Sequence, residues 1–108
     1  MEKFVKTILV VNTGSSSVKF TLFFAADLHV AASGLVERIG LEGTRLVYRC
    51  PGQETIQRLV SIPDIGNAIK LILPLLTDSQ AGVIGSKEDI RAIGHRVVHG
   101  GSTSASQP

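Results

Sequence analysis

The chain has 108 residues, 44% of them hydrophobic, and a formal net charge of +2 from 11 basic and 9 acidic residues. Such a length and composition fit one globular domain with a modest core rather than a disordered chain. The weak, scattered positive charge argues against a nucleic-acid partner, which requires clustered Lys and Arg. The apolar run at residues 8–11 is short and ends at a polar residue, so we expect neither a signal peptide nor a membrane partner.

Cys50 is the single cysteine. A lone cysteine excludes an intramolecular disulfide and argues against a cysteine-based zinc site. We expect Cys50 to be a small apolar residue on a strand, in a reducing compartment, the cytoplasm.

The first half of the chain predicts antiparallel strands joined by short turns. β-branched or alternating apolar residues indicate strands at Thr7–Val11, Val18–Phe24, His29–Arg38, Arg45–Cys50 and Thr55–Ser61. The first of these is a continuous apolar run, which favours a strand buried on both faces. The short Gly/Ser loop after it predicts a hairpin, and the later turns predict a meander.

The apolar period changes after residue 64 to that of an amphipathic helix, carried by Ile65, Ala68, Ile69, Ile72, Leu73 and Leu76. Asp64 is a suitable N-cap, and Pro74 is expected to kink or end the helix. Residues 78–88 resemble a linker, and residues 90–98 predict a further strand. The expected fold is therefore α/β, a helix packed on a mixed sheet, with residues 1–101 as one domain and 102–108 as a disordered tail.

The first segment with a chemical signal is Asn12–Lys19. Gly14 and the three serines that follow it allow a sharp turn whose N–H groups and hydroxyls can hold phosphate oxygens, with Lys19 adding positive charge. Asn12 offers a neutral amide to a phosphate or a magnesium-bound water. On composition alone a plain polar hairpin turn is the better explanation of the segment. It is neither a Walker A loop nor a Gly-x-Gly-x-x-Gly fingerprint.

The second segment with a chemical signal contains His95 and His99, spaced as in a zinc-protease helix, but Arg96 stands where that motif needs Glu. The valines and flanking glycines favour a strand, in which residues four apart lie about 13 Å from each other and cannot share a metal. Arg96 and Val98 then share one face, a pair suited to a short carboxylate. A solvated arginine and two structural histidines are the alternatives.

Three segments together resemble the acetate kinase family. Residues 8–20 (Ile-Leu-Val-Val-Asn-Thr-Gly-Ser-Ser-Ser-Val-Lys-Phe) are similar to its N-terminal signature, residues 37–40 (Glu-Arg-Ile-Gly) to a tetrapeptide further along, and residues 94–101 (Gly-His-Arg-Val-Val-His-Gly-Gly) to its second characteristic block. Their order and spacing agree with the family, and the resemblance covers residues 6–101. It implies the N-terminal part of an acetate kinase, half of a ribonuclease H-like, actin-like ATPase domain.

The resemblance also implies an activity and roles for single residues. The enzyme would transfer the γ-phosphoryl group of ATP reversibly to acetate with Mg²⁺ as cofactor, and the whole protein would be a homodimer. Asn12 would contact the magnesium–polyphosphate region, and Arg96, as the catalytic residue, would hold the acetate carboxylate or the transferring phosphoryl group. Val98 would line the pocket for the acetate methyl, and the phosphate site would be lined by Ser15, Ser16, Ser17 and Lys19.

The family also shows what this sequence lacks. Its members are several times longer, and their downstream catalytic Asp, Arg and His and their adenosine pocket have no counterpart here, so we expect the chain alone to be inactive. Residues 102–108 depart from the usual continuation of the family. The alternatives are a propionate or butyrate kinase, a non-catalytic phosphate- or nucleotide-binding module of the same fold, and a purely structural β domain.

Overall fold

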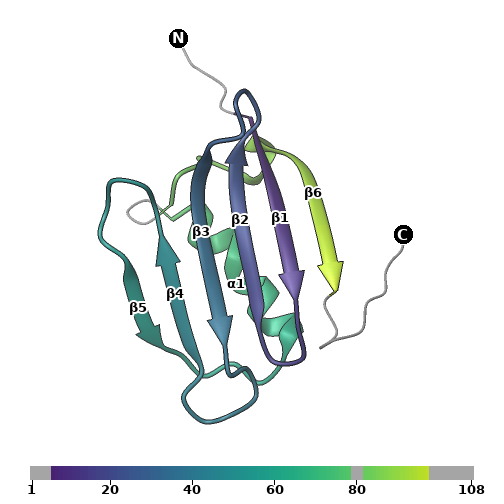
Figure 1. Ribbon diagram of the computed structural model, residues 1–108, viewed down its shortest axis with the longest axis vertical. Helices are drawn as coiled ribbons and strands as arrows, with labels where there is room; N and C mark the ends of the chain where they lie inside the picture. The colour runs from purple at the N-terminus through teal and green to yellow at the C-terminus, as the bar shows by residue number, and fades with distance from the viewer. Residues whose placement is uncertain (1–5, 79–81, 98–108) are drawn as a thin grey trace.

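The computed structural model of the chain describes residues 6–78 and 82–97. Its elements are β1 (Thr7–Thr13), β2 (Val18–Phe24), β3 (Val30–Glu37), β4 (Arg45–Arg49), β5 (Ile56–Leu59), α1 (Ile65–Leu76), η1 (Lys87–Asp89) and β6 (Ile90–Val97). They form a six-stranded sheet in the order β5-β4-β3-β2-β1-β6, with α1 on one face (Figure 1). The first five strands pair as an antiparallel meander, and β6 pairs parallel with β1. The predicted order of strands, helix and final strand is confirmed.

The limits of the elements differ from the sequence prediction in a few places. β1 runs two residues further than expected, to Thr13, because Thr13 pairs with Val18 and closes a four-residue loop. Cys50 lies just after β4 rather than on it, and it is buried. The expected linker contains the short 3₁₀ helix η1, and the Thr7 hydroxyl donates to the Asp89 carbonyl at 2.9 Å, which ties η1 to the start of β1.

β1 is fully buried on one face only. Leu9 and Val11 are buried on the face that carries α1, whereas Ile8 and Val10 on the other face are half-buried. The expectation of burial on both faces is therefore wrong. The physical reason is that α1 packs against one face, and no other element in the described residues covers the opposite one (Figure 1).

The core on the α1 side is built around a row of three residues on neighbouring strands. Phe20 pairs with Gly34, and Gly34 pairs with Tyr48. The two aromatic rings are almost fully buried, and their centroids lie 6.3 Å apart. A Cβ on Gly34 would lie 2.3 Å from Cζ of Phe20, so the glycine leaves the space that the phenyl ring occupies.

α1 begins as the sequence predicts but does not end at its proline. The Asp64 side chain accepts a hydrogen bond from the Asn67 backbone N–H at 2.9 Å, as expected of an N-cap. The helix continues two residues past Pro74, although the proline ring deprives it of one backbone N–H donor. The Thr77 hydroxyl then closes the helix by donating to the Leu73 carbonyl at 2.9 Å. No helix in the described part of the chain is long and apolar enough to cross a membrane.

Candidate phosphate-binding site

The three sequence segments that resemble the acetate kinases converge on one end of the sheet. The hairpin loop 14–17 follows β1, and the carboxyl end of β6 lies at the same edge because β6 is parallel to β1. β3 runs antiparallel to β2, so the turn that starts at Glu37 reaches this edge as well. In Figure 1 all three lie at the lower end of the sheet. Ligands of sheets with parallel strands bind at such carboxyl ends.

The loop 14–17 is a tight turn with spare hydrogen-bond donors. The Gly14 N–H donates to the Ser17 carbonyl at 2.9 Å, while Ser15 is exposed and Ser16 and Ser17 are half-buried. Within residues 6–78 and 82–97, no backbone hydrogen bond uses the N–H of Ser15 or Ser16. Two backbone donors and three hydroxyls are therefore available to an anion at this loop.

The tetrapeptide 37–40 holds the serine loop in place. The Ile39 N–H donates to the Ser16 carbonyl at 2.9 Å, and the Ile39 side chain is buried. Arg38 adopts φ 60°, a left-handed conformation unusual for a residue with a side chain, and the Thr44 hydroxyl donates to its carbonyl at 2.7 Å. The sequence identifies residues 37–40 only as a tetrapeptide similar to that of the acetate kinases. Their supporting role could not be predicted, because a contact between residues 16 and 39 leaves no local pattern in the sequence.

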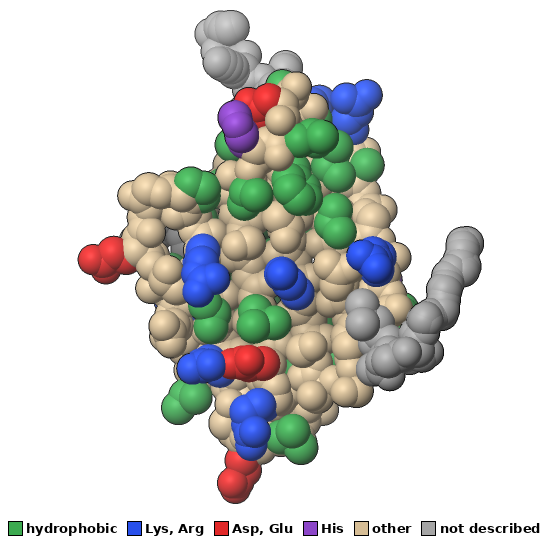
Figure 2. Space-filling model, viewed as in Figure 1, with side chains coloured by type: hydrophobic (Ala, Val, Ile, Leu, Met, Phe, Trp, Pro, Cys, Tyr) green, Lys and Arg blue, Asp and Glu red, His purple; other side chains and the backbone are tan. Residues whose placement is uncertain are grey.

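Three predicted site residues lie in one row across neighbouring strands. Asn12 on β1 pairs with Lys19 on β2 and with Arg96 on β6, so all three side chains share the face opposite α1. Strands lie about 4.8 Å apart, which puts the backbones of Lys19 and Arg96 about 10 Å from each other. Both cations are exposed, and neither forms a salt bridge with another described residue. Figure 2 shows this face, with basic side chains across the middle of the sheet.

The neighbouring residues of β6 lie on the other face, as the alternation predicts. His95 and Val97 pair with Val11 and Thr13 on the α1 side, and His95 Nε2 lies 3.4 Å from the Thr13 hydroxyl. This contact supports the structural interpretation of His95. Val98, the residue expected to line the acetate pocket, and His99 lie outside the described residues, as does the tail 102–108.

The Asn12 side chain contains a polar atom without a partner. Its Oδ1 is buried and accepts no hydrogen bond from any described residue. A buried amide oxygen normally has a partner, and amide oxygens are among the ligands of Mg²⁺. The described residues contain no cluster of His, Cys, Asp or Glu that could hold a metal ion alone. The donor set thus fits a magnesium ion that arrives with a phosphorylated ligand, as Mg²⁺ commonly does.

A serine-rich hairpin beside a row of lysine, asparagine and arginine forms a candidate phosphate-binding site on an α/β domain. The model of the acetokinase family matches residues 7–107, and on this basis the chain belongs to the acetokinase family.

Comparison with curated acetate kinases shows what share of their length the chain covers. The acetate kinase of Moorella thermoacetica is 54% identical over 95 residues, which is 88% of this chain and 24% of that enzyme. The acetate kinase of Thermotoga maritima is 47% identical over 95 residues, 87% of this chain and 23% of the relative. The chain therefore spans about a quarter of the length of the curated relatives that it matches.

Solved structures agree on the fold. The crystal structure of Porphyromonas gingivalis acetate kinase superimposes with a TM-score of 0.80 and 42% identity, over 89% of this chain and 24% of that one. A propionate kinase from Francisella tularensis gives a TM-score of 0.70 and 32% identity, over 89% and 23% of the two chains. The expected fold, part of an actin-like ATPase domain, is the fold of these relatives.

Proposed function

We propose that this chain supplies the N-terminal part of an acetate kinase, which transfers the γ-phosphoryl group of ATP reversibly to acetate. The observation that carries the proposal is the row Lys19–Asn12–Arg96 beside the serine loop. Phosphoryl transfer needs in-line positioning and positive charge around the phosphoryl oxygens more than covalent help. Two exposed cations that flank a neutral amide provide part of that environment.

The two cations suit different tasks. The planar guanidinium of Arg96 can make two parallel hydrogen bonds to a carboxylate or a phosphoryl group, so Arg96 would hold the acetate or the group in transfer. The ammonium of Lys19 acts as a point charge, and with Ser15, Ser16 and Ser17 it would bind the nucleotide phosphates. Val98 would line the pocket for the acetate methyl.

Asn12 would serve the magnesium ion. Its Oδ1 lies between the two cationic side chains in the row and lacks a described partner, so it can bind the ion directly or through a water. When bound, the ion neutralises charge on the phosphate oxygens. The side chain remains neutral at any pH, so it adds no repulsion toward the phosphates.

The proposal extends to the whole protein. By analogy with its relatives, the complete enzyme would be a cytoplasmic homodimer that acts on small molecules. Cys50, the single cysteine of the sequence, is buried, which fits a reducing compartment. We expect the chain alone to lack useful kinase activity, because about three quarters of the length of the relatives has no counterpart in it.

A propionate kinase is the second candidate. The likeness to the Francisella tularensis propionate kinase favours it, since that structure shares the same sheet and helix. The choice between acetate and a longer acid depends on the volume of the pocket around Val98, and most of that pocket would come from other parts of an acetokinase.

A chimaera tests the proposal. Residues 7–101 of this chain replace the matching region of the Moorella thermoacetica acetate kinase, and acyl phosphate formation is measured with ATP, Mg²⁺ and acetate, propionate or butyrate. Arg96→Ala should lower kcat/KM about 100-fold or more, and Arg96→Lys should recover only part of it.

Arg49→Ala is the matched control. Arg49 is an exposed arginine on the same face, on β4, three strands from β1 in the sheet. Its loss should change kcat/KM less than about twofold, in line with an exposed residue away from the site. Equal losses in the Arg49 and Arg96 variants, or a folded chimaera that turns over none of the acids, would contradict the proposal and favour the non-catalytic module.

A further inference from the structure

A buried threonine closes the turn that supports the serine loop. Thr44 lies between the turn 38–43 and β4, and it is 3% exposed. Its hydroxyl donates to the Arg38 carbonyl at 2.7 Å, with the Leu41 carbonyl as a second acceptor at 3.1 Å. The Thr44 carbonyl accepts a hydrogen bond from the Val60 N–H at 3.0 Å, which anchors the threonine itself. The Thr44 side chain therefore joins the two ends of the connection between β3 and β4.

The backbone of this turn is unfavourable and has to be held by its surroundings. Arg38 adopts φ 60°, in the left-handed region, which costs free energy for a residue with a Cβ. Such a conformation persists only where neighbouring contacts impose it. The Arg38 carbonyl accepts from the Leu41 N–H at 3.1 Å as well as from the Thr44 hydroxyl, so two hydrogen bonds fix its direction.

The peptide unit between Arg38 and Ile39 links Thr44 to the serine loop. A trans peptide unit is planar, so its C=O and its N–H point in opposite directions. Thr44 binds the C=O of this unit, and the N–H of the same unit donates to the Ser16 carbonyl at 2.9 Å. A rotation of the peptide unit would break both hydrogen bonds together. The Thr44 hydroxyl therefore aims the Ile39 N–H at the serine loop.

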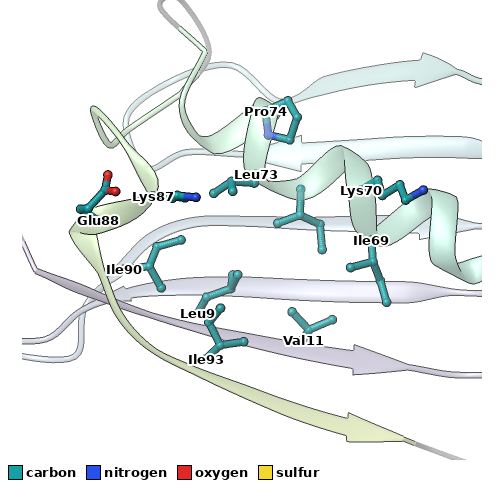
Figure 3. A pocket seen from close by; sticks show the side chains of 11 residues that line it. Leu9, Val11, Ile69, Lys70, Leu73, Pro74, Lys87, Glu88, Ile90 and Ile93 are labelled. Atoms are coloured by element: carbon teal, nitrogen blue, oxygen red, sulfur yellow. The ribbon is translucent and has the colours of Figure 1, made fainter.

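The serine loop has little other support. Among residues 6–78 and 82–97, Ile39 is the one residue outside the hairpin that hydrogen-bonds to the backbone of the loop 14–17. The helix α1 offers no substitute, because an apolar groove of about 720 Å³ lies between it and the strands β1 and β6 (Figure 3). On that side β6 is bare, with Ile93 66% exposed. The position of the loop thus depends on its own hairpin and on the turn that Thr44 closes.

We propose that Thr44 is a positioning residue for the binding of the nucleotide phosphates. It acts through the peptide unit between Arg38 and Ile39 and not by contact with substrate. With its carbonyl held, Ser16 keeps the loop in the conformation that leaves the N–H groups of Ser15 and Ser16 available to an anion. This inference rests on the proposed function, in which the serine loop binds the phosphates of ATP.

Steady-state kinetics of the chimaera test the role of Thr44. Thr44→Val keeps a similar shape without the hydroxyl, and it should raise KM for ATP about tenfold. KM for acetate, which depends on Arg96, should change less than about twofold, and Thr44→Ser should restore most of the affinity for ATP. Thr77→Val is the matched control, because the Thr77 hydroxyl also donates to a backbone carbonyl, that of Leu73 at 2.9 Å. It lies at the far end of α1, about 18 Å from the start of the helix, so both KM values should stay unchanged.

A double variant separates positioning from stability. Glycine adopts φ 60° without strain, so Arg38→Gly should restore the folding of a Thr44→Val protein that is too unstable to assay. KM for ATP should stay raised in the double variant, because the peptide unit still lacks the Thr44 hydroxyl. Arg38→Gly alone should keep the wild-type KM. Loss of stability in Thr44→Val with an unchanged KM for ATP, in the single or the double variant, would overturn the proposal.

Amide hydrogen exchange in the 108-residue chain, followed by NMR, gives a readout without kinase activity. The Ile39 N–H should exchange about tenfold faster in Thr44→Val than in the wild type or in Thr77→Val, and equal rates would overturn the proposal. If the chimaera turns over no acid, the proposed kinase function fails, and titration of the chain with pyrophosphate decides. Shifts of the Ser15 and Ser16 amides that require about tenfold more pyrophosphate in Thr44→Val would support the role of Thr44, whereas equal or absent shifts would refute it.

Discussion

Gly34 offers the sharpest test of the packing in this sheet. It lies between Phe20 and Tyr48 in the register, and the Phe20 ring fills the space above it. In Gly34→Ala the new Cβ would lie 2.3 Å from Cζ and 2.4 Å from Cε2 of Phe20. The ring is 1% exposed and in contact with a buried core, so it cannot move aside freely.

The expected loss of stability in Gly34→Ala follows from two opposing effects. Overpacking of a filled core costs about 1–3 kcal/mol, whereas alanine is favoured over glycine within a strand by roughly 0.5–1 kcal/mol. We therefore expect Gly34→Ala to lower the free energy of unfolding by about 1–2 kcal/mol. For a domain of this size that corresponds to a melting temperature lower by roughly 4–16 °C.

Urea and thermal denaturation of the isolated chain measure this effect, with Gly94→Ala as the control. Gly94 also lies in a strand, but a Cβ there would meet no atom within 4 Å. The free energy of unfolding of the Gly94→Ala variant should therefore equal or exceed that of the wild type. In the Phe20→Leu background the smaller side chain leaves room, and Gly34→Ala should cost less than in the wild type. A wild-type melting temperature for Gly34→Ala, or strict additivity in the double variant, would refute the proposed clash.

Three further changes test single interactions. Burial is the main cause that raises the pKa of the Tyr48 hydroxyl, and the hydrogen bond with Cys50 raises the pKa further. The protonated hydroxyl therefore stabilises the fold fully below the unfolded-state pKa of about 10, and this stabilisation is lost as the pH rises toward the folded-state pKa. Urea titrations between about pH 9 and 11 should show a fall of at most about 1.4 kcal/mol per pH unit that Tyr48→Phe abolishes; an equal slope in both proteins would disprove it. Asp64→Ala should lower the free energy of unfolding by about 1 kcal/mol through loss of the cap to Asn67, and Asp64→Asn should not. Asn12→Val should raise the free energy of unfolding of the isolated chain by about 1 kcal/mol, since it removes a buried oxygen without a described partner. The same change should lower kcat/KM of the chimaera. A destabilised chain would show that the oxygen has a partner.

Alternation along the chain was sufficient to predict the strands, the helix and the division of faces within β6. It could not predict which face of β6 meets α1. Thr7 pairs with Ile90, but Ile8 pairs with Ala92, so a bulge at Arg91 shifts the alternation by one residue. This shift puts Arg96 beside Asn12, and without it Arg96 would lie on the opposite face.

Contacts between distant segments were also beyond local patterns. The hydrogen bond from Ile39 to Ser16 and the bare face of β6 both depend on how whole elements pack. The sequence likewise suggested burial of β1 on both faces, because a continuous apolar run is typical of such strands in complete domains.

The parallel pairing of β1 with β6 has a consequence for synthesis of the chain. Five strands join neighbours in sequence, but Thr7 and Ile90 are more than 80 residues apart. At roughly 5–20 residues per second, the ribosome needs about 4–17 s to deliver β6 after β1. Throughout that interval the free edge of β1 can pair with another nascent chain. The polar residues Thr7, Asn12 and Thr13 near its two ends shorten the apolar stretch exposed to such pairing.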